Sequence, residues 1–209
     1  MDGKYRELVE EYIDEGLDAR RSIDPEAVLA AVKAVSGAIR KGNKLIVFGN
    51  GGSAADALHI VGEFIGLYTN PKEDGPNEKE ISSAIPAKHR LPISAIALTG
   101  NVANITAIAN DYSFEEVYAR QLEGLGREGD VALAISTSGN SNNVIAAVRK
   151  AKEIGIYTIG LSGKTGGRLA QEADMTIRIN SKKTSIIQEA HLTVCHLISI
   201  LVEVELFGK

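Results

Sequence analysis

The stretch KLIVFGNGGSAADALHIVGEF, residues 44–64, holds the pattern that decides the fold. It opens with a short apolar run at 44–48, which is typical of a strand buried on both faces. Three glycines and a serine follow within the five residues 49–53, and a helical pattern then runs over 53–67. A strand that leads through a glycine-rich turn into a helix is the first half of an α/β unit.

The same alternation recurs along the chain. Apolar runs predict further strands at 93–98, 131–136, 157–162 and 175–179. Helical periodicity predicts helices at 102–110, 114–125 and 142–154. Strands that are apolar throughout and alternate with helices indicate a parallel sheet covered on both faces. We therefore predict an α/β fold, a three-layer sandwich around a central five-stranded parallel sheet.

Additional helices are predicted at both ends. Residues 1–41 read as a helical pair, with helices over 2–20 and 25–41, and Asp24 and Pro25 supply the cap and first turn of the second helix. The long segment 184–206 is apolar on most of its circumference. A terminal helix of this kind is expected to be buried, partly against another subunit, so we predict a homo-oligomer.

Two local signals set helix boundaries within the sheet region. Ser113 and Glu116 have the spacing of a capping box at the start of the helix over 114–125. Gly155 is predicted to end the helix over 142–154.

Composition bounds the class of protein. A chain of 209 residues buries roughly 70% of its unfolded surface, so we predict one domain over 1–209. The net charge of −4 and the absence of Trp argue against a nucleic-acid partner. Cys195 is the one cysteine, which excludes an internal disulfide, and its apolar surroundings favour a buried thiol.

The sequence also indicates the cellular location of the protein and the position of a surface loop. The acidic, amphipathic start is unlike a secretory signal, and no run of about 18 uninterrupted apolar residues is present. We therefore expect a cytoplasmic protein with no membrane partner. The polar, proline-rich region 69–91, which contains His89, reads as a surface insertion.

The glycine turn at 49–53 indicates a ligand. Glycines let backbone N–H groups approach a bound group closely, and the following helix N-terminus favours an anion. GNGGSA also fits the dinucleotide fingerprint, which requires an acidic residue about 20 positions on, at the end of a second strand. That position falls in YTNPKED, before any strand, so we reject a dinucleotide site.

A second turn, ISTSGNSNN at 135–143, also joins a strand to a helix. It places the hydroxyls of Ser136, Thr137, Ser138 and Ser141 around one glycine. A plain capped turn needs one hydroxyl, whereas four suit a phosphate. No lysine accompanies them as in a P-loop, so the sequence favours a small phosphorylated metabolite over a nucleoside triphosphate.

Two histidines and a glutamate suggest further chemistry. His59 and Glu63 lie one turn apart on the same helical face, a spacing that suits two ligands of one metal, a base with its partner, or a plain polar stripe. His196 lies in the apolar segment VCHLIS, where it is either a satisfied core histidine or a ligand.

Four ordered segments, GNGGSAADALHIVGEF, TAIANDYSFEEVYARQLEGLGREGD, ISTSGNSNNVIAAVRKAKEIG and IQEAHLTVCHLISILVE, resemble the phosphoheptose isomerases of the sugar isomerase (SIS) domain family, over about 5–206. The resemblance implies a flavodoxin-like SIS fold, a homotetramer, and conversion of sedoheptulose 7-phosphate to D-glycero-D-manno-heptose 7-phosphate through an enediol. It implies a Zn²⁺ ion bound by His59, Glu63, Gln188 and His196, with Glu63 and His196 catalytic. It implies substrate contacts from Asn50, Gly51, Gly52, Ser53, Glu63, Gly100, Asn101, Ser136, Thr137, Ser138, Ser141 and Gln188.

Spacing on the last helix raises one difficulty. Gln188 and His196 are eight residues apart, roughly 12 Å along a helix at ~1.5 Å per residue. Either they reach one ion from above and below at full stretch, or one is supplied by another copy of the chain. We favour the second, with active sites between subunits.

The chain departs from the family pattern at Asn101, where many members carry Asp, at Ile186, where Arg is frequent, and in the longer insertion at 69–91. These departures bear on which sugar is used. Two alternatives remain: an isomerase for another phosphorylated ketose, and a non-catalytic SIS scaffold of the replication-initiation branch.

Overall fold

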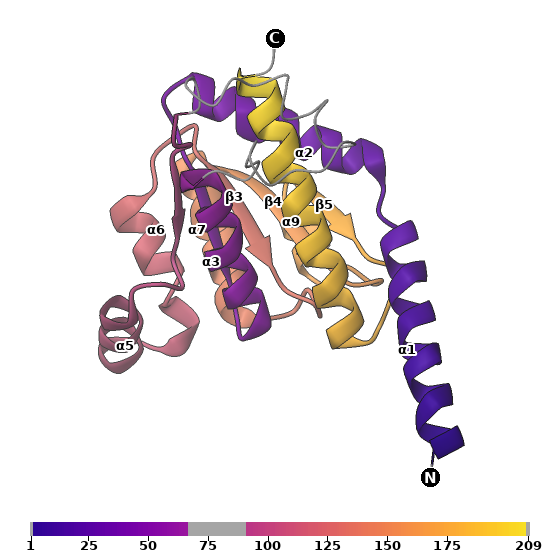
Figure 1. The fold of residues 1–209 in the computed structure, drawn as a ribbon. Coiled ribbons are helices and arrows are strands. Elements are labelled where there is room, and N and C mark those ends of the chain that lie inside the picture. The colour runs from indigo at the N-terminus through magenta and orange to yellow at the C-terminus, as the bar shows by residue number, and fades with distance from the viewer. Residues whose placement is uncertain (1, 67–90, 208–209) are drawn as a thin grey trace.

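The computed structural model describes residues 2–66 and 91–207. The predicted insertion at 69–91 therefore lies outside the described residues except for Leu91. The described strands form one parallel sheet in the order β2-β1-β3-β4-β5 (Figure 1). They are β1 (Leu45–Gly49), β2 (Ala95–Ala97), β3 (Val131–Ile135), β4 (Tyr157–Ser162) and β5 (Met175–Arg178). The prediction of a five-stranded parallel sheet is confirmed.

The central strands β1 and β3 send alternate side chains into two cores, as the two-residue period of a strand requires. Leu45 and Val47 of β1 join one buried cluster, and Ile46 and Phe48 join the other. In β3, which pairs with β1, Leu133 opposite Val47 falls into the same cluster as that residue. Continuous apolar runs in the sequence therefore mark strands that are covered on both faces.

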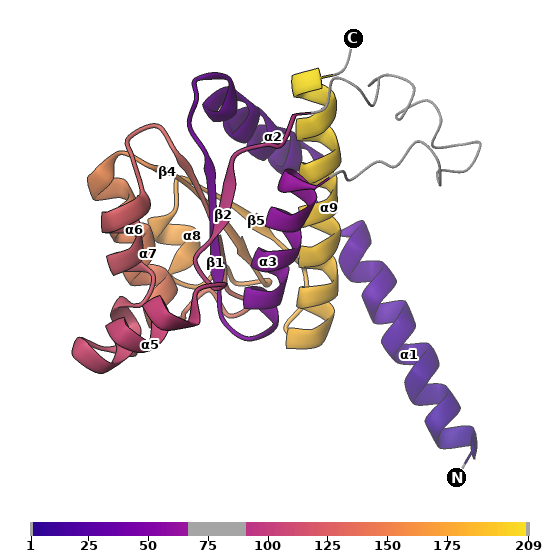
Figure 2. The same ribbon diagram turned by 60° about the vertical axis from the view of Figure 1, so that its left-hand side comes forward.

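Helices cover both faces and complete three layers (Figure 2). One face carries α2 (Pro25–Arg40), α3 (Gly52–Ile65) and α9 (Thr184–Phe207), with α1 (Asp2–Arg21) packed on α9. The other face carries α5 (Val102–Asp111), α6 (Ala119–Leu125), α7 (Asn142–Ile154) and the short α8 (Leu169–Glu172). The N-terminal pair and the long C-terminal helix agree with the sequence prediction, which did not include α8.

Two helix-boundary predictions are confirmed and one is wrong. Asp24 Oδ1 accepts a hydrogen bond from Glu26 N at 3.0 Å, and Gly155 ends α7 in the left-handed conformation with φ +85°. The helix predicted over 114–125 is instead a 3₁₀ turn, η2 (Phe114–Glu116), followed by α6. Ser113 makes no capping hydrogen bond. Burial of Val117 and Tyr118 in the core at the break has outweighed the local capping signal.

The long helix α9 is apolar enough, by length and composition, to cross a membrane, and it is the one such helix in the described ranges. It packs against α1, α2 and α3 of its own chain, which makes it a core helix of the fold. Ile186, Val194 and Ile198 are among its buried residues. Of the most apolar part of α9, 44% is buried within the chain, which leaves apolar surface available to another subunit. The role of α9 at a subunit interface stays a prediction.

The strand order creates a place for a ligand. From β1 the chain crosses to β2 on one side and then returns to β3 on the other. The loops that leave the carboxyl ends of β1 and β3 therefore diverge, and in open α/β sheets this divergence forms the binding crevice. Both turns singled out in the sequence, 49–53 and 136–141, follow these two strands.

Candidate functional site

A pocket of about 250 Å³ lies between the two turns. Its lining brings together eight residues that the sequence predicted: Asn50, Gly51, Gly52, Ser53, Ser136, Thr137, Ser141 and Gln188. Ile135 and Thr184 also line it and were not predicted. No charged side chain is among the described residues of this lining.

Three helices begin at this pocket. The first residue of α3 is Gly52 and that of α9 is Thr184, and both line the pocket, while α7 begins directly after the lining residue Ser141. Their free N–H groups and positive dipole ends favour an anion. Ser136 Oγ and Ser141 Oγ lie 3.1 Å apart, which is close enough for both hydroxyls to donate to oxygens of one phosphate. The pocket therefore suits a phosphate bound without a cationic side chain.

The turn after β3 is held in shape by its neighbours. Gly139 has φ +66°, and an added Cβ would lie 2.0 Å from Gly166 O. Arg168 donates to the Asn140 carbonyl oxygen at 2.9 Å. Ser138 is exposed, does not line the pocket, and accepts from Asn140 N at 3.1 Å. Its predicted contact with substrate stays a prediction. Its hydroxyl supports the turn.

The loop after β2 lies away from this lining. Asn101 Oδ1 accepts from Asn104 N at 3.1 Å and caps α5, and an added Cβ at Gly100 would meet Leu58 of α3. Both residues were predicted substrate contacts, and they stay predictions. Ile186, where the family often carries Arg, is fully buried in the core, so the isoleucine packs apolar surface there.

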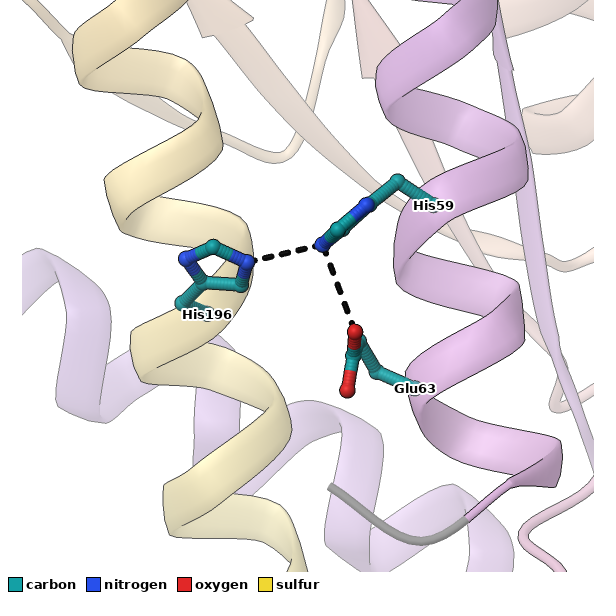
Figure 3. Close-up of side chains that lie close together, drawn as sticks. All are labelled: His59, Glu63 and His196. Atoms are coloured by element: carbon teal, nitrogen blue, oxygen red, sulfur yellow. Dashed lines mark hydrogen bonds and ion pairs between the residues drawn. The ribbon is translucent and has the colours of Figure 1, made fainter. Parts of the chain in front are cut away.

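His59, Glu63 and His196 come together in one chain (Figure 3). His59 Nε2 lies 2.7 Å from His196 Nε2 and 3.3 Å from Glu63 Oε1. One ligand atom from each residue lies within 4.8 Å of the other two. We call this group the His–Glu–His trio. It lies beyond the pocket along α3, since His59 follows Gly52 by seven residues, roughly 10 Å at ~1.5 Å per residue.

Electrostatics keep the trio ready to bind a cation. Burial lowers the pKa of His196, His59 lowers it further, and Glu63 acts in the opposite direction. A neutral imidazole is the form that coordinates metal. Two ring nitrogens and one carboxylate oxygen are donors that zinc accepts in proteins. The residues present therefore fit a zinc ion.

The structure places Gln188 at the pocket. An added Cβ on Gly52 would lie 2.4 Å from Gln188 Nε2, so the amide rests against the glycine turn. A second copy of the chain was predicted to supply a ligand because Gln188 and His196 lie too far apart on one helix to reach one ion easily. Because the trio assembles within one chain, it does not need a second copy. Gln188 as a fourth ligand, and a site between subunits, both stay predictions.

Two ionisable groups near the site, the half-buried Asp56 and the fully buried His191, were not predicted from the sequence. Burial raises the pKa of Asp56, on α3 between Gly52 and His59, to about 6, although nearby His59 acts to lower it. Burial lowers the pKa of His191, on α9 between Gln188 and His196, to about 4. The available signal was spacing: both residues lie on the same helices as the predicted ligands, one turn away.

Comparison with known proteins agrees with this geometry. Residues 10–72 and 82–163 match the SIS domain. A phosphoheptose isomerase of Clostridium acetobutylicum is 39% identical over 209 residues, covering 98% of this chain and 97% of that protein. One from Roseiflexus sp. is 42% identical over 192 residues, covering 91% and 88%. The structure of a phosphoheptose isomerase from Neisseria gonorrhoeae aligns with TM-score 0.81 at 32% identity, covering 95% of this chain and 98% of that one.

A parallel sheet in this strand order, with a hydroxyl-lined pocket at its switch point, defines an α/β protein of the SIS type. At the level of identity and coverage just given, the chain belongs to the phosphoheptose isomerase family of enzymes within the SIS domain proteins.

Proposed function

We propose that this chain interconverts sedoheptulose 7-phosphate and D-glycero-D-manno-heptose 7-phosphate. One observation carries the proposal: a pocket suited to a phosphate lies roughly 10 Å along α3 from the His–Glu–His trio. A phosphorylated sugar can occupy both places at once, with its carbonyl end at the trio. The names of the relatives support the same reaction class.

The pocket's role is to anchor the remote phosphate. Ser136, Thr137 and Ser141 donate from their hydroxyls, and the N-terminus of α7 adds free N–H groups. The backbone of the glycine turn, with Ser53, contacts sugar hydroxyls. Binding energy from the phosphate then holds the reacting carbons in place, which is how a remote group contributes to catalysis.

The trio's role is proton transfer. Isomerisation moves a proton between C1 and C2 through an enediol, which needs a base beside those carbons and an acid at the oxygens. Glu63 carries the proton between the carbons, and His196 exchanges a proton with the oxygens.

Zinc is part of the proposal. His59, Glu63 and His196 would hold the ion, and Gln188 is the fourth candidate. Because a carboxylate bound to zinc is a weaker base, Glu63 serves as ligand and as base in different states of the site. When bound, zinc supplies positive charge that stabilises negative charge developing on the substrate oxygens. Metal analysis of purified protein tests this without an activity assay. We expect about one zinc per chain, and loss of zinc in His59→Ala with the fold retained.

We also propose a homo-oligomer, with a tetramer as in the family. One face of α1 exposes Tyr5, Leu8, Val9 and Ile13, each more than half exposed. A contiguous apolar stripe of this kind marks an interaction site. We assign the protein to the cytoplasm, because a doubly charged sugar phosphate does not cross a bilayer unaided.

The direct experiment incubates purified protein with sedoheptulose 7-phosphate and follows the aldose by NMR. Addition of a chelator tests the metal in the same assay, and readdition of zinc is the control. Formation of the aldose, lost with chelator and restored with zinc, supports the proposal. Turnover of a pentulose or octulose phosphate alone would assign another sugar. Absence of turnover on every ketose phosphate would favour the scaffold reading.

A further inference from the structure

We infer that Asn143 is a positioning residue that joins the two substrate-binding loops through Asn50. The pair, which we call the amide clasp, fixes the distance between the phosphate-binding turn and the helix that carries His59 and Glu63. This inference rests on the proposed function of the two loops. Neither Asn143 nor any cross-loop contact was predicted from the sequence.

The amide clasp is reciprocal. Asn50 Nδ2 donates to Asn143 Oδ1 at 2.8 Å, and Asn143 Nδ2 donates to Asn50 Oδ1 at 2.8 Å. Asn143 Oδ1 also accepts from Val144 N at 2.9 Å. Asn143 is 3% exposed, so water competes poorly for these bonds. Each amide donates one hydrogen bond to the other and accepts one from it, and this reciprocal pairing has one favourable arrangement, which makes the pair a rigid link.

Tyr118 contacts the same loop from the core of the protein. Its hydroxyl donates to the Gly49 carbonyl oxygen and lies 3.3 Å from Asn50 Oδ1. Burial raises the pKa of Tyr118 to about 12, so the phenol keeps its proton. The centroid of its ring lies 5.5 Å from the ring centroid of Phe48, a residue of β1. The loop after β1 is therefore tied both to α7 and to the core.

This arrangement changes the role of Asn50. One N–H and the oxygen of its side-chain amide are engaged by Asn143. Asn50 also lines the pocket, and we expect this loop to contact substrate mainly through its backbone. The phosphate-binding turn has separate supports in Gly139 against Gly166 and in Arg168. Loss of the clasp should therefore shift the loop after β1, and with it the start of α3, while the turn keeps its shape.

Asn143→Ala tests the inference by separating two affinities. We expect the Kd of inorganic phosphate, measured by calorimetry, to change less than about twofold, since the turn is intact. We expect kcat/KM for sedoheptulose 7-phosphate to fall about 10- to 100-fold, because misplacement by about 1 Å costs rate on that scale. Tyr118→Phe, which removes one hydroxyl and keeps the ring, should give a smaller loss of the same kind. Asn110→Ala, an exposed amide on α5, is the matched control.

Two outcomes would overturn the inference. One is an unchanged kcat/KM in Asn143→Ala. The other is a loss of phosphate affinity equal to the loss of kcat/KM, which would mean that the turn itself had collapsed.

A second measurement keeps the inference testable if the wild-type protein turns over no ketose phosphate. Hydrogen exchange should be about tenfold faster in Asn143→Ala at the amides of Ser53 and Ala54, which donate to the carbonyl oxygens of Asn50 and Gly51. The amide of Gly139, which donates to Ser136 O, should be unchanged. Equal exchange at Ser53 and Ala54 in both proteins would contradict the clasp, independently of the proposed activity.

Discussion

Among single residues, His191 has the least ordinary environment. It is fully buried, and among the described residues only the Ser162 backbone interacts with its ring as a hydrogen-bonding group, without the geometry of a full hydrogen bond. Burial lowers its pKa to about 4, while the Ser162 backbone acts in the opposite direction. The imidazole is therefore neutral in the fold at physiological pH.

This pKa predicts how stability depends on pH. His191 in the unfolded chain has a pKa of about 6.5, so below this pH the unfolded chain binds a proton that the native state does not bind until the pH nears 4. The free energy of unfolding should therefore fall as pH drops from about 6.5 to about 4, by up to about 3 kcal/mol. Denaturant unfolding of His191→Leu across this range should show a smaller decline than wild type. Equal declines would show that the pKa of His191 does not change on folding.

Glu63 is the residue on which the proposed proton transfer depends. Glu63→Gln keeps the shape and one oxygen donor but removes the basic carboxylate. We expect kcat to fall about 10²- to 10⁴-fold, the range for a general base, with little change in phosphate affinity. Glu115→Gln, an exposed glutamate in η2, is the matched control. A Glu63→Gln enzyme with wild-type kcat would exclude this carboxylate as the base.

At the scale of elements, the turn after β3 depends on one glycine. Gly139→Ala places a methyl group 2.0 Å from Gly166 O at a positive φ, so the turn must move. We expect at least a tenfold loss of phosphate affinity by calorimetry. Gly37→Ala in α2 is the matched control, because an added Cβ there meets nothing within 4 Å. That change should stabilise the protein by about 0.5–1 kcal/mol. Unchanged phosphate affinity in Gly139→Ala would remove the turn from the binding site.

The elements also show what a sequence can predict. Apolar runs identified all of β1 to β5, and the signal is unbroken in β1 and β3, which are buried on both faces. The split between η2 and α6 escaped prediction, since burial of Val117 and Tyr118 outweighs the local capping pattern. His59 and Glu63 were predictable from spacing on one helix. The amide clasp was not, because Asn50 and Asn143 are 93 residues apart and only the sheet order brings them together.

For the whole molecule, the exposed face of α1 predicts self-association. Val9→Lys with Ile13→Lys places two charges in the apolar stripe, and we expect a smaller assembly by analytical ultracentrifugation. Asp14→Lys, on the opposite face of α1, adds positive charge outside the stripe and should leave the assembly unchanged. An assembly of wild-type size in the double variant would show that the subunits meet elsewhere.

In the proposed mechanism, one chain anchors a phosphate at the switch point and moves a proton at the His–Glu–His trio. The most direct measurement follows sedoheptulose 7-phosphate with the purified protein in D₂O by NMR. We predict D-glycero-D-manno-heptose 7-phosphate carrying solvent deuterium at C2, because the proton that Glu63 removes exchanges with solvent. No conversion by zinc-loaded protein would contradict the account.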